Sequence, residues 1–223
     1  MSGNVESSLK DGDERNFCFL SIDAVGHSKL SLIFSPESIN NTLMNLRIWI
    51  NSIIKDKNGT ELNWGSDGGN FYFLKDKVSD KAIDNAVISS KEILKGLAHF
   101  NDSHNRLSKD GKRTDIRLRL GLDFGSAIYR VDHGNLCSEY LNTACKIQKE
   151  AQPNSAMLTH DIHKSLSHDL INNLKADFNL RETSLKFKDQ PSYIFYLERI
   201  IDQAYEEYFN SISRLRQREF EHL

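Results

Sequence analysis

The chain has 223 residues, of which 39% are hydrophobic and 27% charged, as is typical of a globular protein with one large domain. The formal net charge of −2 predicts no general attraction to nucleic acid, and no apolar run is long enough to span a membrane. Cys18, Cys137 and Cys145 lack metal-ligand spacing and the N-terminus lacks a signal-peptide pattern, so we expect a reducing, cytoplasmic location.

The first part of the chain predicts a tail, a strand and a helix. Residues 1–14 are polar and are expected to form a flexible, solvated tail. The unbroken apolar run 17–22 predicts a central strand, which ends at Asp23. Ser35 and Pro36 predict the start of a helix, because serine is a good N-cap and proline suits the first helical position.

A hairpin and a second helix are expected next. The short runs 61–64 and 70–74 have strand composition, and residues 66–69 between them have turn composition. Ser79 is a candidate cap for the second helix. Residues 101–113 are polar and interrupted by glycine and asparagine, which predicts a loop.

The remaining pattern predicts a mixed fold. Alternation over 115–129 predicts a long strand with a bend at Gly125, and Ser138 caps a helix that follows a loop at 132–137. Later strands are expected at 156–159, 185–187 and 193–197, with a short helix at 161–167 and an apolar helical stripe from 201 to 215. The order β-α-β-β-α-β with extra C-terminal elements predicts an α+β, ferredoxin-like sheet layered with helices.

Two aspartates are candidate metal ligands. Asp23 ends the central strand and Asp67 lies in the hairpin turn. In this strand order the first strand lies beside the hairpin, so the carboxylates are expected to meet at one edge of the sheet. Two carboxylates suit Mg²⁺, which takes oxygen ligands and few of them from protein, although each aspartate alone is more often a cap or turn residue. The backbone amides after the strand are candidates for cradling a triphosphate, at Val25, Gly26, His27 and Ser28.

Four segments, in order, resemble the catalytic domain of class III nucleotidyl cyclases, the adenylyl and guanylyl cyclases. They are residues 19–28, 66–73, 119–125 and 141–146. The resemblance spans roughly residues 17–198. It implies a nucleotidyl cyclase domain at 15–199, followed by a C-terminal helix at 200–223 packed on the domain or on its dimer mate. It also implies a head-to-tail homodimer in which the ribose 3′-oxygen attacks the α-phosphate and releases pyrophosphate.

The same resemblance assigns roles to residues of both protomers. Asp23, Asp67 and the backbone of Ala24 would hold two Mg²⁺ or Mn²⁺ ions in one protomer, and Asn142 and Lys146 would act from the other. Asn142 and Lys146 are four residues apart on an expected helix, so they face the same way. The family has arginine where this chain has Lys146, which keeps the charge but not the planar fork. A solvent-facing polar pair on an amphipathic helix is the alternative.

The positions that read adenine in adenylyl cyclases are Asn63 and Asn135 here, in place of a lysine and an aspartate. The loss of both charged readers argues against ATP. An amide donates and accepts, so it suits uracil and cytosine alike. An exposed polar position on the hairpin is the alternative for Asn63.

These substitutions, with no sensor or membrane domain evident, resemble the pyrimidine cyclases of Pycsar antiphage defence. That resemblance implies synthesis of cyclic UMP or, next, cyclic CMP from a nucleoside triphosphate, and a separate effector that the cyclic nucleotide activates. No nucleic-acid or membrane partner is expected. Two other functions stay open, an adenylyl cyclase with a substituted pocket and a catalytically silent cyclase-like module that binds a nucleotide or a partner.

Overall fold

The computed structural model describes residues 9–75, 81–109, 111–130, 135–187 and 189–197. The expected cap Ser79 and the expected C-terminal helix at 200–223 lie outside these ranges. Part of the expected tail does not: Leu9 is buried in a hydrophobic cluster, and the Gly12 amide donates to the Tyr129 carbonyl at 2.8 Å. The ordered domain therefore begins earlier in the chain than composition indicated.

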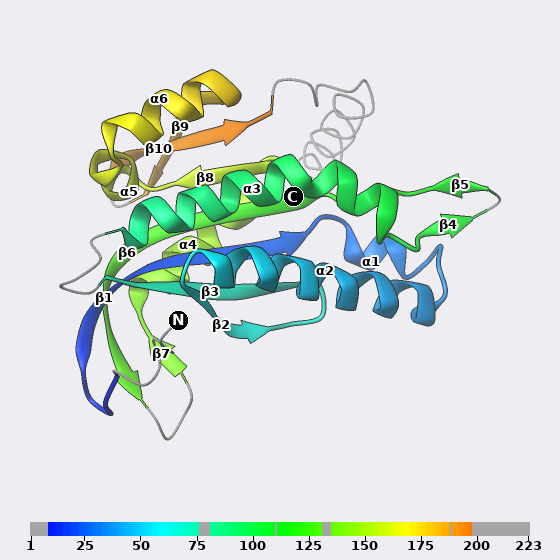
Figure 1. The fold of residues 1–223 in the computed structure, drawn as a ribbon, viewed down its shortest axis with the longest axis horizontal. Helices are drawn as coiled ribbons and strands as arrows, with labels where there is room; N and C mark the ends of the chain where they lie inside the picture. Colours follow the sequence, from blue (N-terminus) through cyan, green and yellow to red (C-terminus); the bar gives the residue numbers. More distant parts are fainter. Residues whose placement is uncertain (1–8, 76–80, 110, 131–134, 188, 198–223) are drawn as a thin grey trace, which may run out of the picture.

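An eight-stranded sheet forms the centre of the molecule (Figure 1), in the order β2-β3-β1-β6-β8-β10-β9 with β7 paired to β6. Its strands are β1 (Glu14–Ala24), β2 (Gly59–Trp64), β3 (Gly68–Lys75), β6 (Leu118–Arg130), β7 (Asn135–Cys137), β8 (Ser155–Leu158), β9 (Asn179–Phe187) and β10 (Gln190–Tyr196). Strand β1 lies between β3 and β6, so the prediction of a central strand at 17–22 is confirmed.

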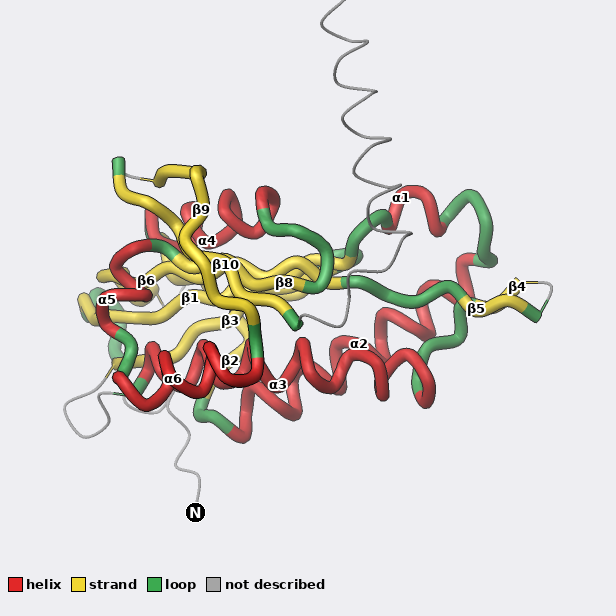
Figure 2. The backbone as a smooth tube through the Cα atoms, turned by 90° about the horizontal axis from the view of Figure 1, so that it is seen from above, coloured by secondary structure: helices red, strands yellow, loops and turns green. Residues whose placement is uncertain are grey.

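The helices form layers on both faces of the sheet. They are α1 (His27–Leu30), α2 (Pro36–Asp56), α3 (Ala82–Ser103), α4 (Glu139–Glu150), α5 (His160–Ser165) and α6 (His168–Asp177). Helices α2 and α3 lie side by side along one face (Figure 2), whereas α4 contacts β1 and β6 from the opposite face. None of the helices within the described ranges has both the length and the apolar character needed to cross a membrane.

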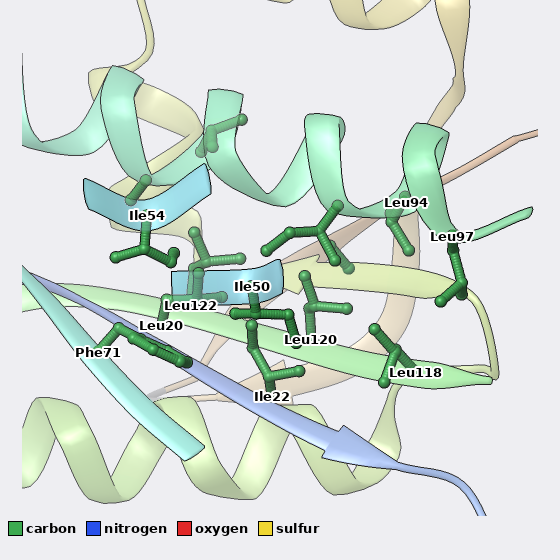
Figure 3. Packing of buried hydrophobic residues seen from close by; sticks show 14 of the residues in the cluster. Leu20, Ile22, Ile50, Ile54, Phe71, Leu94, Leu97, Leu118, Leu120 and Leu122 are labelled. Atoms are coloured by element: carbon green, nitrogen blue, oxygen red, sulfur yellow. The ribbon is translucent and has the colours of Figure 1, made fainter. Parts of the chain in front are cut away.

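The main core lies between the sheet and helices α2 and α3. Leu20 and Ile22 of β1 point from the sheet toward Ile50 and Ile54 of α2 (Figure 3), and all four are buried. Burying a side chain of this size contributes about 1.5–3 kcal/mol. The alternate residues of β1, including Phe17, face the other way and pack with the α4 side. Strand β1 is thus covered on both faces, as its unbroken apolar run requires.

Helix α4 is seated directly on β6 at two glycines. A Cβ atom at Gly121 would lie 2.3 Å from the Ala144 carbonyl oxygen and 2.5 Å from the Gln148 amide nitrogen, and one at Gly125 would lie 2.2 Å from the Tyr140 ring. The predicted interruption at Gly125 is wrong, since β6 runs through it as one strand. The glycine instead makes room for an aromatic ring on the face of the strand.

Other boundaries also differ from the expectations. The segment 101–113 is not all loop, because α3 continues to Ser103 and the short strands β4 (Ser108–Lys109) and β5 (Lys112–Arg113) pair with each other. Asn101 is polar but buried, and its side chain exchanges two hydrogen bonds with the Ile116 backbone, at 3.0 and 2.8 Å. Residues 135–137 of the expected loop form β7, and α6 was not expected.

We expect Gly121→Ala to destabilise the protein, because the added methyl group would push against the backbone of α4. The expected cost is about 1–3 kcal/mol, as for other overpacked sites. Thermal unfolding of the purified variant measures it. Gly65→Ala is the matched control, since its Cβ atom would make only an ordinary contact, 3.6 Å from the Gly68 carbonyl oxygen. Equal melting temperatures for the two variants would contradict direct seating of α4 on β6.

Candidate metal and nucleotide site

The two aspartates lie at the same edge of the sheet, as the strand order predicts. Asp23 at the end of β1 is paired with Gly68 at the start of β3. The amide of Ala24 donates to the Asp67 carbonyl at 2.8 Å, which joins the strand end to the hairpin turn. Asp67 therefore immediately precedes the residue opposite Asp23.

Gly68 allows this close approach. A Cβ atom at this position would lie 2.1 Å from the Ile22 carbonyl oxygen, a distance that no side chain can occupy without a backbone shift. Gly68 is therefore required for the close approach of the hairpin to β1, and not only for the turn itself. The glycine brings the hairpin against β1, and the aspartate beside it is placed at the end of that strand.

Both carboxylates have neighbours and remain open to solvent. Asp23 Oδ2 accepts a hydrogen bond from Arg119 Nη2 at 2.6 Å, and its side chain is 25% exposed. Asp67 Oδ2 lies 3.9 Å from His27 Nδ1, Asp67 Oδ1 accepts from the Ser66 hydroxyl at 3.0 Å, and its side chain is 34% exposed. Solvent, and hence an ion, can reach both groups.

Arg119 is not a freely solvated residue, because its side chain is only 28% exposed and pairs with Asp23. It is the β6 residue paired with Asp23, so both side chains project from the same face of the sheet. Its Nη1 also donates to the Lys149 carbonyl of α4 at 3.1 Å. Arg119 therefore connects the end of β1 to the last turn of α4.

The two carboxylates fit a hard divalent cation. Mg²⁺ is commonly held by one or two carboxylates together with waters and substrate phosphates. Within the described ranges no three His, Cys, Asp or Glu side chains are grouped so that they could hold a metal. A metal at Asp23 and Asp67 would thus depend on substrate oxygens for much of its coordination, as Mg²⁺ or Mn²⁺ does at a triphosphate. The part assigned to the Ala24 backbone stays a prediction.

The predicted phosphate-binding segment is only partly open. The Val25 amide donates to the Arg117 carbonyl at 2.8 Å, so the expectation that Val25 offers a free donor is wrong. Gly26 adopts a left-handed conformation with φ of 79° and precedes the single turn of α1. The amides of Gly26, His27 and Ser28 donate to no other residue in the described part of the chain. These three amides remain candidates for contact with a phosphate.

Asn142 and Lys146 lie on the exposed side of α4, as their spacing predicts. The predicted cap is confirmed, since the Ser138 hydroxyl accepts from the Tyr140 amide at 3.2 Å. Asn142 lies seven residues, or about 10 Å along the helix axis, from Lys149, where α4 meets Arg119. Within one chain, Asn142 is therefore near the opposite end of α4 from the carboxylates.

The two candidate base-reading residues lie on different strands. Asn63 is exposed on β2, directly opposite Asn70 on β3. Asn70 Nδ2 donates to Asn63 Oδ1 at 2.9 Å, and the Cys145 thiol of α4 donates to Asn70 Oδ1 at 3.4 Å. Asn135 opens β7, where its backbone pairs with Arg130. Its part in base reading stays a prediction.

No protein-family model matches the sequence, and no curated protein matches it. Solved structures do. The adenylyl cyclase CyaB from P. aeruginosa is 15% identical over 84% of this chain and 96% of its own, with a TM-score of 0.67. The guanylate cyclase domain of RhGC from Catenaria anguillulae, in complex with GTP, is 16% identical over 83% and 98%, with a TM-score of 0.63. A guanylyl cyclase domain of the RhoGC fusion protein from Blastocladiella emersonii is 14% identical over 84% and 98%, with a TM-score of 0.68.

The chain has the class III cyclase fold. The fold predicted from the sequence is thus confirmed, at identities too low for the similarity to carry more than the fold. Inspection of the sequence missed Arg119 as a partner of Asp23, and Asn70 and Cys145 as neighbours of Asn63. Alternation along 115–129 could have placed Arg119 on one face of the strand, but only the register of β1 with β6 puts it against Asp23.

We expect Arg119→Gln to bind Mn²⁺ more tightly than the wild type in the absence of nucleotide. Its guanidinium now neutralises Asp23, and removing one nearby positive charge favours a cation by on the order of 1 kcal/mol, or roughly fivefold in affinity. Calorimetry or electron paramagnetic resonance measures the binding. Arg113→Gln is the control, since Arg113 pairs with Asp102 and Asp115 instead. Unchanged affinity in Arg119→Gln would mean that Asp23 does not hold the ion.

Proposed function

We propose that this protein is a nucleotidyl cyclase that converts a pyrimidine nucleoside triphosphate, UTP before CTP, into a 3′,5′-cyclic nucleotide and pyrophosphate. The observation that carries the proposal is the placement of Asp23 beside Asp67 at the end of a central strand in a class III cyclase fold. Adenylyl and guanylyl cyclases share that fold, and one of those structures is a complex with GTP.

The residues have distinct parts in the proposed reaction. When bound, two Mg²⁺ or Mn²⁺ ions would supply positive charge for the attacking and leaving oxygens, held by Asp23, Asp67 and the Ala24 backbone. Asn142 would orient the ribose, so that its 3′-oxygen points at the α-phosphate. Lys146 offers a positive charge to the phosphates. Such a reaction depends mainly on positioning and on charge stabilisation.

We propose a head-to-tail homodimer with the sites between protomers. Arg119 contacts both Asp23 and the Lys149 carbonyl in the last turn of α4, so Asp23 lies near that end of the helix. Asn142 lies in the first half of α4 and faces solvent. Tyr140 and Leu141 on the same helix are only partly buried. A second chain that covers this face would bring its carboxylates to Asn142 and Lys146. Each site would then need two chains.

Complementation tests the shared site. We expect Asp23→Ala and Asn142→Ala to reduce cyclase activity at least about 100-fold each, because each removes one half of both sites. A mixture of the two variants should recover activity, since a heterodimer contains one site with every residue intact. Lys109→Ala, on the exposed β4, is a control that should change nothing. If subunit exchange is verified by mass and the mixture stays inactive, the shared site is wrong.

The choice of a pyrimidine rests on the base-reading positions. Asn63 is exposed and uncharged, where adenylyl cyclases carry a lysine, so it offers an amide to an incoming base. We expect cyclic UMP or cyclic CMP as the main product when the purified protein is incubated with equal concentrations of the four nucleoside triphosphates and Mn²⁺ or Mg²⁺. Chromatography with mass detection identifies the product. Cyclic AMP as the dominant product would instead make the protein an adenylyl cyclase with a substituted pocket.

We further propose that the cyclic pyrimidine nucleotide is a second messenger in antiphage defence that activates a separate effector. The support is the resemblance of the base-reading positions to those of the Pycsar cyclases. A catalytically silent module that only binds nucleotide is the second candidate, favoured by the Arg119–Asp23 ion pair and by Lys146 in place of arginine. Tight nucleotide binding without any cyclic product would select that candidate.

A further inference from the structure

We propose that Asn70 and Cys145 hold the Asn63 amide with its NH₂ group directed to the substrate, so that the site selects the carbonyl-bearing edge of uracil over the amino-bearing edge of cytosine. This inference rests on the proposed function, because it names which pyrimidine the cyclase takes. In it, Asn63 touches the base, whereas Asn70 and Cys145 are positioning residues.

The three side chains form one hydrogen-bonded chain. The Cys145 thiol donates to Asn70 Oδ1 at 3.4 Å, and Asn70 Nδ2 donates to Asn63 Oδ1 at 2.9 Å. Cys145 and Asn70 are partly buried, while Asn63 is exposed at the end of the chain. Within the described ranges, Asn63 Nδ2 has no acceptor. The free end of the chain is therefore a donor that faces solvent.

The contact with the thiol favours one direction for these hydrogen bonds. An asparagine amide can turn over and exchange its donor and acceptor ends, but a thiol can donate to the amide oxygen, whereas sulfur is only a weak acceptor for the NH₂ group. Asn70 is therefore held with its oxygen toward Cys145 and its NH₂ group toward Asn63. That NH₂ group in turn holds the Asn63 oxygen. Reversing both amides would turn the Asn70 NH₂ group toward the sulfur, a weak acceptor, and would leave the thiol without an acceptor.

The backbone around Asn63 is also held firmly. Glu61, two residues earlier on β2, accepts from Arg47 Nε of α2 at 3.0 Å and from Asn51 of the same helix. Partial burial opposes ionisation of Glu61, but these hydrogen bonds outweigh it and lower the pKa of the carboxyl group. The Glu61 carboxylate thus connects β2 to α2 through hydrogen bonds. The pairing of β2 with β3 is irregular between Glu61 and Asn63. Asn63 is thus presented from an anchored strand.

A donor at this position distinguishes the two pyrimidines. Uracil presents a carbonyl oxygen where cytosine presents an amino group that can only donate. The free Asn63 NH₂ group pairs with the carbonyl and faces the amino group donor to donor. Cys145 also lies between Asn142 and Lys146 in the sequence of α4. One protomer would therefore supply the three hydrogen-bonded side chains that read the base as well as the proposed contacts to the ribose and the phosphates.

Asn70→Asp tests the inference by reversing the amide. An aspartate still accepts from Cys145 but cannot donate to Asn63, so the Asn63 NH₂ group should turn toward it and present its oxygen to the base. We expect the ratio of kcat/KM for UTP to that for CTP to exceed 1 in the wild type and to fall at least about tenfold in Asn70→Asp, the size expected for one directional hydrogen bond. Asn63→Asp, which only accepts, should shift the ratio the same way.

Lys109→Ala, on the exposed β4, is the control, because Lys109 lies outside the three hydrogen-bonded side chains, and its ratio should stay within about twofold of the wild type. An unchanged ratio in an Asn70→Asp protein of normal melting temperature would overturn the inference, and so would a wild type that prefers CTP. If the wild type cyclises no nucleotide, the proposed function fails. Calorimetry then tests the orientation of the Asn63 amide separately, through the ratio of the affinities for UTP and CTP. If Asn70→Asp does not change that ratio, the inference is overturned.

Discussion

The register of strand β1 against its two neighbours is the constraint on which the rest of the site depends. On one side it sets Asp23 opposite Gly68, and on the other it sets Asp23 opposite Arg119. A slip of one residue would turn Asp23 to the other face of the sheet and place an apolar side chain at the site. The buried packing of both faces of β1 prevents such a slip, so the core that stabilises the fold also positions the carboxylate.

Helix α4 connects the two functional ends of this face. Because it lies directly against Gly121 and Gly125, its Cys145 reaches Asn70 and its Lys149 carbonyl reaches Arg119. One helix thus contacts both the hairpin that carries Asn63 and the strand end that carries Asp23. A change in how α4 packs on the sheet would alter the contacts of Asn70 and those of Arg119 together.

Arg119 gives Asp23 a positive partner at the end of β1. Two carboxylates at one sheet edge repel each other, and the guanidinium next to Asp23 offsets that repulsion. The pair is partly exposed, so it contributes modestly to stability and can be displaced or shared. Among the described residues, the Asp67 carboxylate accepts from the Ser66 hydroxyl and lies farther from the His27 ring nitrogen. The two carboxylates would therefore differ in how readily they accept a cation.

The sequence alone determined the fold class and the main helices and strands, though not α6 or β7, because caps, turns and alternation act over a few residues. Ser35 and Ser138 cap their helices as predicted, and Asp67 lies in the predicted hairpin. Only the tertiary structure decided the contacts of the site. Arg119 and Asp23 are 96 residues apart and Asn70 and Cys145 are 75 apart, so no local pattern relates them. Such pairs form because strand register and helix packing, which depend on the whole core, bring distant residues to one face.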